Sequence, residues 1–156
     1  MHKSNATFYV NQIGTVVRDG DDVLLVLEKS VIPALCCLSE FSHVIVLWWA
    51  HQLDGEDERK VLQIQPPYAP NTDTGVFASR APIRPNPIMT TVCPIEDVDE
   101  ANGIVKVSNI DAMHGSPILD LKGYFACCDR VERPVVPAWI PDWGPWLPRT
   151  GIGLDE

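Results

Sequence analysis

Positive charge is scarce in this 156-residue sequence, where 12 Lys and Arg residues face 21 Asp and Glu residues and leave a formal net charge of −9. Proteins that hold nucleic acid through its phosphates usually present a basic face. The charge balance therefore disfavours tight, non-specific binding of nucleic acid. Any such binding would depend on a local basic patch created by folding.

Cysteine and histidine occur without the spacing that a zinc site needs. The sequence has no Cys-x-x-Cys and no His-x-x-x-His pair, so we expect no metal site. An odd number of cysteines that includes two adjacent pairs is also a poor disulfide framework. We expect reduced thiols, as in the cytosol, at Cys36, Cys37, Cys93, Cys127 and Cys128.

Two further absences narrow the class of protein. No apolar run approaches the roughly 20 residues of a membrane span, and the first residues do not resemble a secretory signal. No Gly-x-Gly-x-x-Gly motif leads from a strand into a helix, so a Rossmann-type nucleotide site is not supported. We therefore expect a cytoplasmic protein without a membrane segment, and a fold of another type.

Turn-forming residues are plentiful, with 14 Pro and 10 Gly, and the segments between them are short. Asp19-Gly20-Asp21 predicts a tight hairpin turn, Val31–Glu40 predicts a short helical turn, and the apolar run His43–Ala50 predicts a strand buried on both faces. Many short strands with little amphipathic helix predict a mainly β fold, an antiparallel barrel or sandwich. The principal strands that we expect are Phe8–Arg18, Val23–Leu27, His43–Ala50, Val61–Gln65, Gly103–Ile110 and Pro117–Leu121.

The C-terminal stretch differs in composition from the rest. Residues 134–156 carry five Pro and three Trp (Trp139, Trp143 and Trp146), which excludes a regular helix or a central strand. We predict a domain of residues 1–133 and an irregular extension of residues 134–156 that packs on the domain or on a partner subunit. The tryptophans could close a pocket or join two subunits, and both interpretations stay open here.

The stretch Gly75–Ile88 is the most unusual part of the chain. Three prolines stiffen it around Arg80 and Arg84, and no acidic residue occurs from Thr74 to Ile95. A stiff loop loses little entropy when it binds a ligand. The two guanidinium groups could therefore hold a carboxylate or a phosphate, or they could pair with acids elsewhere in the fold.

This stretch resembles the Gly-Val-Phe-Ala-Thr-Arg-Ser-Pro-x-Arg-Pro-Asn-Pro-Ile signature of the TrmO/TsaA-like (YaeB-like) family. Three further blocks are similar in the same order: Glu40–Leu47, His51-Gln52, and Asp111 with Gly115–Lys122. The resemblance implies a small antiparallel β-barrel, a homodimer, and S-adenosylmethionine (S-adenosyl-L-methionine) as the cofactor. It also implies methyl transfer to threonylcarbamoyl-adenosine in transfer RNA, or to a related small molecule.

The family's site residues carry over position by position. Asp111 matches the position that we interpret as catalytic, either as a cofactor orienter or as a proton acceptor. The cofactor-binding positions implied by the resemblance are His51, Gln52, Arg80, Thr90, Ser108, Asn109, Ile110 and Asp111. Trp48 and Trp49 could stack on an adenine, although a buried strand explains them more simply.

Two departures from the family pattern bear on the substrate. Met89 stands where the family usually has glycine after Pro-Ile, and a side chain there could narrow the cofactor pocket. The acidic turn Asp19–Asp22 replaces a longer loop that often carries Pro-Arg-Gln. The loss of a basic loop favours a small-molecule acceptor over transfer RNA. The alternatives are a non-catalytic binding protein on the same barrel and, more distantly, a thiol enzyme using Cys127-Cys128.

Overall fold

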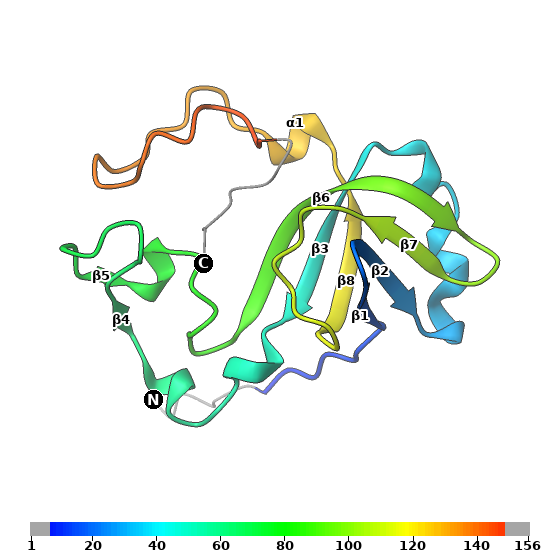
Figure 1. Cartoon of the computed structure of the whole chain (residues 1–156), viewed down its shortest axis with the longest axis horizontal. Helices are drawn as coiled ribbons and strands as arrows, with labels where there is room; N and C mark the ends of the chain where they lie inside the picture. Colours follow the sequence, from blue (N-terminus) through cyan, green and yellow to red (C-terminus); the bar gives the residue numbers. More distant parts are fainter. Residues whose placement is uncertain (1–6, 149–156) are drawn as a thin grey trace, which may run out of the picture.

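The computed structural model describes residues 7–148 and centres on a closed barrel of six antiparallel strands (Figure 1). The strand order around the barrel is β1-β2-β7-β6-β3-β8. This confirms the predicted mainly β fold with a small antiparallel barrel. The barrel strands are β1 (Gly14–Asp19), β2 (Asp22–Leu27), β3 (His43–Trp49), β6 (Ile88–Asp99), β7 (Ile104–Val107) and β8 (Pro117–Gly123).

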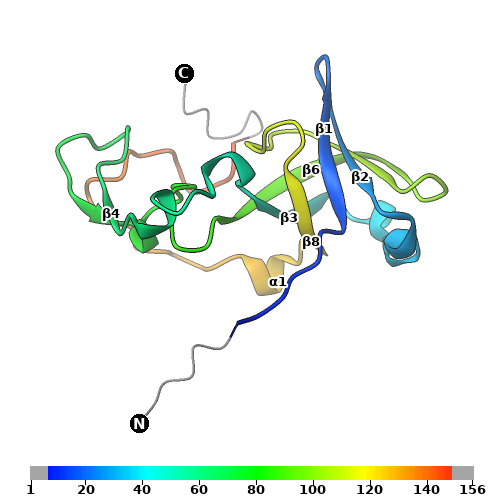
Figure 2. The same ribbon diagram turned by 90° about the horizontal axis from the view of Figure 1, so that it is seen from below.

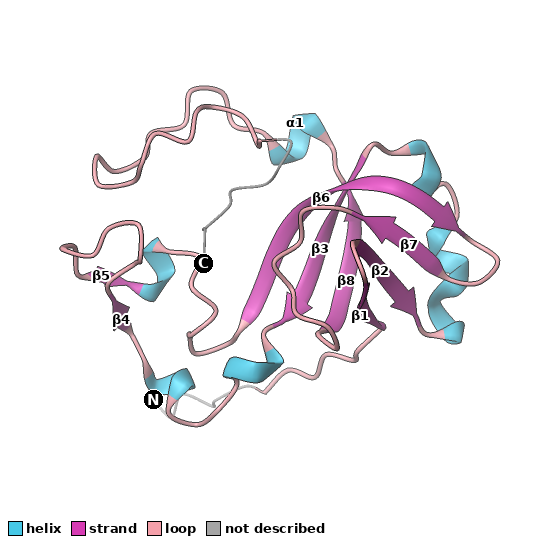
Figure 3. Ribbon diagram, in the orientation of Figure 1, coloured by secondary structure: helices cyan, strands magenta, loops and turns pink. Residues whose placement is uncertain are grey.

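The remaining elements are short (Figure 3). A two-stranded sheet of β4 (Gln63–Ile64) and β5 (Thr74–Gly75) lies outside the barrel. The 3-10 helices are η1 (Lys29–Leu35), η2 (Leu38–Glu40), η3 (His51–Leu53), η4 (Glu58–Lys60) and η5 (Val76–Ala78), and the one α-helix of the described residues is α1 (Ala126–Asp129). No helix among residues 7–148 combines the length and apolarity needed to cross a membrane.

The β1–β2 hairpin confirms the predicted turn but shortens the predicted first strand. Asp19 pairs with Asp22, and Gly20 has a φ of 58°, which fits the first central position of a type II′ turn. The strand begins at Gly14 rather than Phe8, because its partner β2 ends at Leu27, opposite Gly14. The residues before Gly14 therefore have no β2 residue to pair with.

Residues that point into the barrel alternate with residues that point outward along the strands, and the inward-facing ones form the core. Val16, Leu25, Val44, Val105 and Ile118 are fully buried inside the barrel. The prediction that His43–Ala50 is buried on both faces was wrong, because β3 alternates between buried and half-buried residues. A barrel strand has one inner face, and only the residues that point inward are fully enclosed. The fourth predicted strand is also shorter than expected and is reduced to β4.

β6 and β7 pair over only part of the length of β6. β6 pairs with β3 along Ile88–Pro94 and with β7 only from Ile95 onward. Ser108 still donates its N–H to the Pro94 carbonyl at 3.3 Å, and Asn109 then turns the chain with a φ of 60°. Asparagine tolerates this left-handed conformation better than most residues do. The first half of β6 is thus left without a neighbouring strand on that side.

The C-terminal segment runs from α1 along the sheet of β4 and β5, as both views show (Figures 1 and 2). Tyr68 holds it there, since its ring stacks on Trp139 with centroids 6.5 Å apart and meets Trp143 edge-on at 5.1 Å. Residues 134–148 form no helix or strand, as their composition predicted. Residues 149–156 of the predicted extension lie outside the described residues, and the division into 1–133 and 134–156 stays a prediction.

Candidate functional site

The signature loop is fixed by hydrogen bonds of its own. Arg84 donates through Nη2 to the carbonyls of Val76 at 2.6 Å and Ser79 at 2.9 Å, and its Nε is buried with no hydrogen-bond partner among the described residues. Pro87 accepts the N–H of Ala50 at 2.9 Å, which ties the loop to the end of β3. Arg84 therefore shapes the loop, and its guanidinium bonds to backbone carbonyls and to no acidic side chain of residues 7–148.

Arg80 lies differently from Arg84. The residue is exposed, and its Nη1 reaches the Thr90 carbonyl at 3.5 Å, which is the limit of a hydrogen bond. Its guanidinium thus keeps most of its donors available beside the open edge of β6. Of the two arginines singled out by the sequence, Arg80 is the one with an exposed guanidinium.

A second segment is held in place by Arg18 of β1. Its guanidinium donates to the Ala112 carbonyl at 2.9 Å and to the Ile110 carbonyl at 2.5 Å. The Arg18 N–H also donates to Nδ1 of His114 at 3.1 Å. These bonds hold the carbonyl groups of the two residues on either side of Asp111. Sequence reasoning missed Arg18, because a lone arginine on a strand shows no motif and its partners are backbone atoms.

Two adjoining cavities lie between the signature loop and this segment, and Asp111 lines both. We call the first the arginine cavity. It has a volume of about 250 Å³ and is lined by Arg80, Thr90, Thr91, Val92, Asn109, Asp111 and Leu147. We call the second the histidine cavity. It has a volume of about 300 Å³, and its lining includes Trp48, His51, Gln52, Pro82, Asp111 and Met113.

The structure brings together six of the eight predicted site residues. The two exceptions are Ser108 and Ile110, which are not in the lining of either cavity as residues 7–148 form it. Ile110 is buried in the core and contributes its carbonyl to Arg18. Met89 also lines neither cavity and packs against the core. The missing glycine therefore does not put a side chain into the predicted site.

The buried groups of the histidine cavity are fixed by hydrogen bonds. Nδ1 of His51 lies 3.3 Å from the hydroxyl oxygen of Ser116, which is almost fully buried. Nε1 of Trp48 donates to the Thr91 hydroxyl at 3.1 Å. No group of three or more His, Cys, Asp or Glu side chains within residues 7–148 is arranged to hold a metal ion.

The environment of Asp111 changes its acidity. Although the residue as a whole is exposed, its carboxyl group is partly enclosed at the junction of the cavities, and this desolvation raises its pKa. The nearby charge of Arg18 opposes the shift. A carboxylate with a raised pKa is a better proton acceptor near neutral pH than an ordinary one. The role of Asp111 as a proton acceptor stays a prediction.

The raised pKa of Asp111 gives a prediction for stability. The folded state holds this proton more tightly than the unfolded chain, so the group's contribution is present at low pH and is lost as the pH rises through the raised pKa. An Asp111→Asn variant should therefore unfold at the same or a higher temperature than the wild type at pH 7. The difference should shrink toward pH 4, and thermal unfolding followed by circular dichroism between these values measures it.

Asp99 provides a control, because its pKa is shifted in the opposite direction from that of Asp111. Hydrogen bonds from Asn102 lower the pKa of Asp99, so its contribution is present at neutral pH and is lost as the pH falls through the lowered pKa. An Asp99→Asn variant should be less stable than the wild type at pH 7. Loss of stability at pH 7 in the Asp111→Asn variant would contradict this account of the site.

Comparison with known proteins places this geometry in a family context. A family model described as the tRNA-methyltransferase O N-terminal domain matches residues 12–130. The fold is similar to the crystal structure of TrmO from Pseudomonas aeruginosa, with a TM-score of 0.64 and 26% identity over 83% of this chain and 62% of that one. The matched range contains every residue of the two cavities except Leu147.

The sequence relatives are described either as probable S-adenosyl-L-methionine-binding proteins or as tRNA methyltransferases. The chain is 34% identical over 116 residues to a probable S-adenosyl-L-methionine-binding protein of Methanocaldococcus jannaschii, covering 74% of this chain and 90% of that protein. A protein of the same description from Halobacterium salinarum is 43% identical over 79 residues, 51% of this chain and 56% of the relative. The tRNA (adenine(37)-N6)-methyltransferase of Rattus norvegicus is 42% identical over 100 residues, 64% of this chain. The chain spans only 22% of that enzyme.

Proposed function

Because the chain belongs to the family of tRNA-methyltransferase O N-terminal domains, we propose that it binds S-adenosylmethionine in the arginine and histidine cavities and transfers its methyl group to a nucleoside-like acceptor. The observation that carries this proposal is the convergence of Arg80, His51 and Asp111, which lie far apart in the sequence, on two cavities that share a wall. Each cavity is close to the lower end of the size range of small-molecule sites.

The residues present fit the chemical groups of the cofactor. Arg80 offers a planar fork of donors for the carboxylate of the amino-acid portion. Pro82, Met113 and Trp48 give the histidine cavity an apolar wall suited to an adenine ring. When bound, S-adenosylmethionine supplies an electrophilic methyl group on a sulfonium, so the protein has mainly to orient the reactants and exclude water.

Asp111 is the residue to which we assign the proton. An amine or amide nitrogen that accepts a methyl group must lose a proton, and Asp111 lines both cavities. Its raised pKa favours proton uptake. His51 is the neighbouring imidazole, and its contact with Ser116 holds its ring orientation.

Charge favours a small acceptor over a whole transfer RNA. Arg84 and Arg18 donate hydrogen bonds to backbone carbonyls, so two of the cations near the site have fewer donors left for phosphates. The hairpin beside Arg18 carries Asp19, Asp21 and Asp22, which would repel a polyanion. We propose threonylcarbamoyl-adenosine as a nucleoside, or a similar small molecule, as the acceptor, with transfer RNA as the alternative.

Titration with S-adenosylmethionine in a calorimeter tests the proposed cofactor. We expect the wild type to bind and the Arg80→Ala variant to bind about tenfold to a hundredfold more weakly, because a charge-assisted hydrogen bond contributes about 1.5–3 kcal/mol. Lys60→Ala is the matched control, since it also removes one positive charge but from an exposed pair with Glu56 and Asp57. Its affinity should equal that of the wild type.

The outcomes separate the proposal from its rival. If the wild type does not bind S-adenosylmethionine, the proposed function is wrong. If it binds but forms no S-adenosylhomocysteine with the nucleoside or with transfer RNA that contains it, the chain is a non-catalytic binding protein on the same barrel. The names of the archaeal relatives favour this second candidate, because they describe binding and not transfer.

A second copy of this chain is the partner that we propose. Phe8 and Tyr9 are 85% and 94% exposed and line, with Trp49 and Ile88, a broad hollow of about 750 Å³ beside the open end of β6. Large apolar side chains clustered in this way are unusual on a monomer and are typical of an interface. The homodimer implied by the family resemblance would cover them.

A further inference from the structure

A separate cavity lies at the other end of the barrel strands from the proposed methyl-transfer site. That site lies at the end of β3 and before the start of β8, whereas this cavity lies where β3 begins and β8 ends. Its volume is about 330 Å³. We call it the thiol cavity, and its lining includes Leu27, Leu35, Leu38, Phe41, Leu121 and Phe125, together with Cys36 and Cys37.

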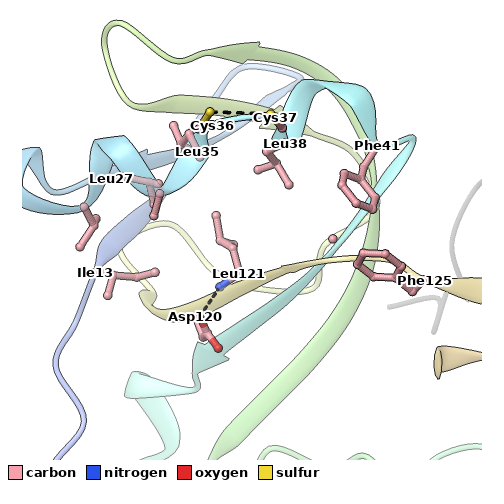
Figure 4. A pocket seen from close by; sticks show the side chains of 13 residues that line it. Ile13, Leu27, Leu35, Cys36, Cys37, Leu38, Phe41, Asp120, Leu121 and Phe125 are labelled. Carbon is pink, nitrogen blue, oxygen red and sulfur yellow. Dashed lines mark hydrogen bonds between the residues drawn. The ribbon is translucent and has the colours of Figure 1, made fainter.

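The polar side chains of its wall are the two thiols and the carboxylate of Asp120. Figure 4 shows the aliphatic side chains and two phenyl rings around the space, with the two sulfurs together at its rim. Asp120 also contributes to the wall, but its carboxylate accepts hydrogen bonds from the Leu121 N–H at 3.0 Å and from the Lys122 ammonium at 2.5 Å. A ligand of this cavity would therefore meet an apolar body and a pair of soft sulfur atoms.

The backbone holds the two sulfurs on the same side. They are 3.7 Å apart, and Cys36 and Cys37 occupy the central positions of a type II turn, with φ and ψ of −48° and 127°, then 65° and 4°. The second position normally carries glycine, because a Cβ there is strained. Strain retained beside a cavity points to a use for the side chain that causes it.

We propose that the thiol cavity is a second ligand site, which takes a small apolar molecule bearing a trivalent arsenic centre and binds it through both Cys36 and Cys37. The bond between arsenic and oxygen in R–As=O is replaced by two bonds between arsenic and sulfur. The two thiol protons leave with the oxygen as water, and no atom changes its oxidation state. The apolar group R occupies the cavity between the phenyl rings of Phe41 and Phe125.

The other cysteines provide an internal comparison. Cys127 and Cys128 also have sulfurs 3.7 Å apart and are exposed, but they lie on α1 and do not line the thiol cavity. Cys93 is buried, and burial followed by the charge of Asp111 raises the pKa of its thiol to about 12. The two adjacent pairs thus share the dithiol geometry, and one of them has the apolar cavity beside it.

Competition on the full chain tests this site. Phenylarsine oxide and arsenite are added separately to the wild type, to Cys36→Ser/Cys37→Ser and to Cys127→Ser/Cys128→Ser, with a monothiol as competitor, and intact mass spectrometry counts the adducts. At Cys36 and Cys37, we expect that displacing phenylarsine oxide from the protein requires a monothiol concentration at least tenfold higher than displacing arsenite. At Cys127 and Cys128 the two compounds should differ less than threefold.

A cavity-filling variant separates the cavity from the thiols. Ala34 lines the cavity and is exposed, so Ala34→Phe should fold while occupying the space for R. It should keep arsenite binding and lose the tenfold preference for phenylarsine oxide. An equal preference at the two cysteine pairs, or a preference that survives Ala34→Phe, would overturn the proposal. None of these variants changes the proposed methyl-transfer site, so its calorimetric titration should be unaffected in all of them.

Discussion

An Arg18→Met variant should bind S-adenosylmethionine about tenfold to a hundredfold more weakly than the wild type, although Arg18 lines neither cavity of the proposed site. Its guanidinium braces the carbonyls of Ile110 and Ala112, and Asp111 lies between them. Hydrogen bonds from a charged donor contribute about 1.5–3 kcal/mol each. Their loss lets this segment adopt conformations in which Asp111 no longer faces both cavities.

Two measurements distinguish positioning from charge and from general destabilisation. Arg18→Lys keeps the positive charge that opposes the raised pKa of Asp111 but cannot reproduce the planar fork, so it should recover little of the affinity. The two lost hydrogen bonds set a limit of roughly 3–6 kcal/mol on the stability lost in Arg18→Met, and thermal unfolding checks that the variant is folded at the temperature of the titration. Full affinity in Arg18→Met, or complete rescue by lysine, would show that the brace is unimportant.

Leu25→Ala should cost the barrel about 3–5 kcal/mol of stability. Leu25 is fully buried at the centre of β2, and replacing a buried leucine by alanine removes apolar contacts and leaves a cavity. For a chain of this length, each kcal/mol corresponds to roughly 2–4 °C in Tm. We therefore expect the midpoint of thermal unfolding to fall by roughly 6–20 °C.

The neighbouring residue on the same strand is the matched control. Leu24 has the same side chain but points outward and is only half-buried. Leu24→Ala should cost less than about 1 kcal/mol, because the site stays open to solvent and no enclosed cavity forms. Comparable losses at the two positions would contradict the assignment of the inner and outer faces of β2.

Strand periodicity and turn chemistry are local, so the sequence predicted an antiparallel barrel or sandwich, and the family resemblance selected the barrel. Gly20 and the alternation in Gly103–Ile110 needed no tertiary information. The order of strands and the gap between β6 and β7 could not be derived from the sequence, because they depend on which strands pair although they lie far apart in the chain. The first predicted strand was too long for the same reason, since pairing with β2 decides where β1 begins.

The residues of the candidate site that belong to contiguous sequence motifs could be predicted. The signature loop identified Arg80, and the family blocks identified His51 and Asp111, which the fold brings to the same cavities. The difference between Arg80 and Arg84 was not predictable, because the carbonyls that bind Arg84 become neighbours only after the loop folds. Likewise, Tyr68 carried no signal that it would anchor Trp139 and Trp143.

Closure of the barrel sets the order of events during synthesis. β1 pairs with β8 through Gly14 opposite Ile118, so its second edge has no partner until about 100 further residues have been made. At roughly 5–20 residues per second, the ribosome needs on the order of 5–20 s to supply them. The β1–β2 hairpin leaves the exit tunnel before β8 does, and until then one edge of β1 has no partner strand. An unpaired strand edge of this kind can aggregate or bind a chaperone. Barrel closure is therefore a late step that follows the emergence of β8.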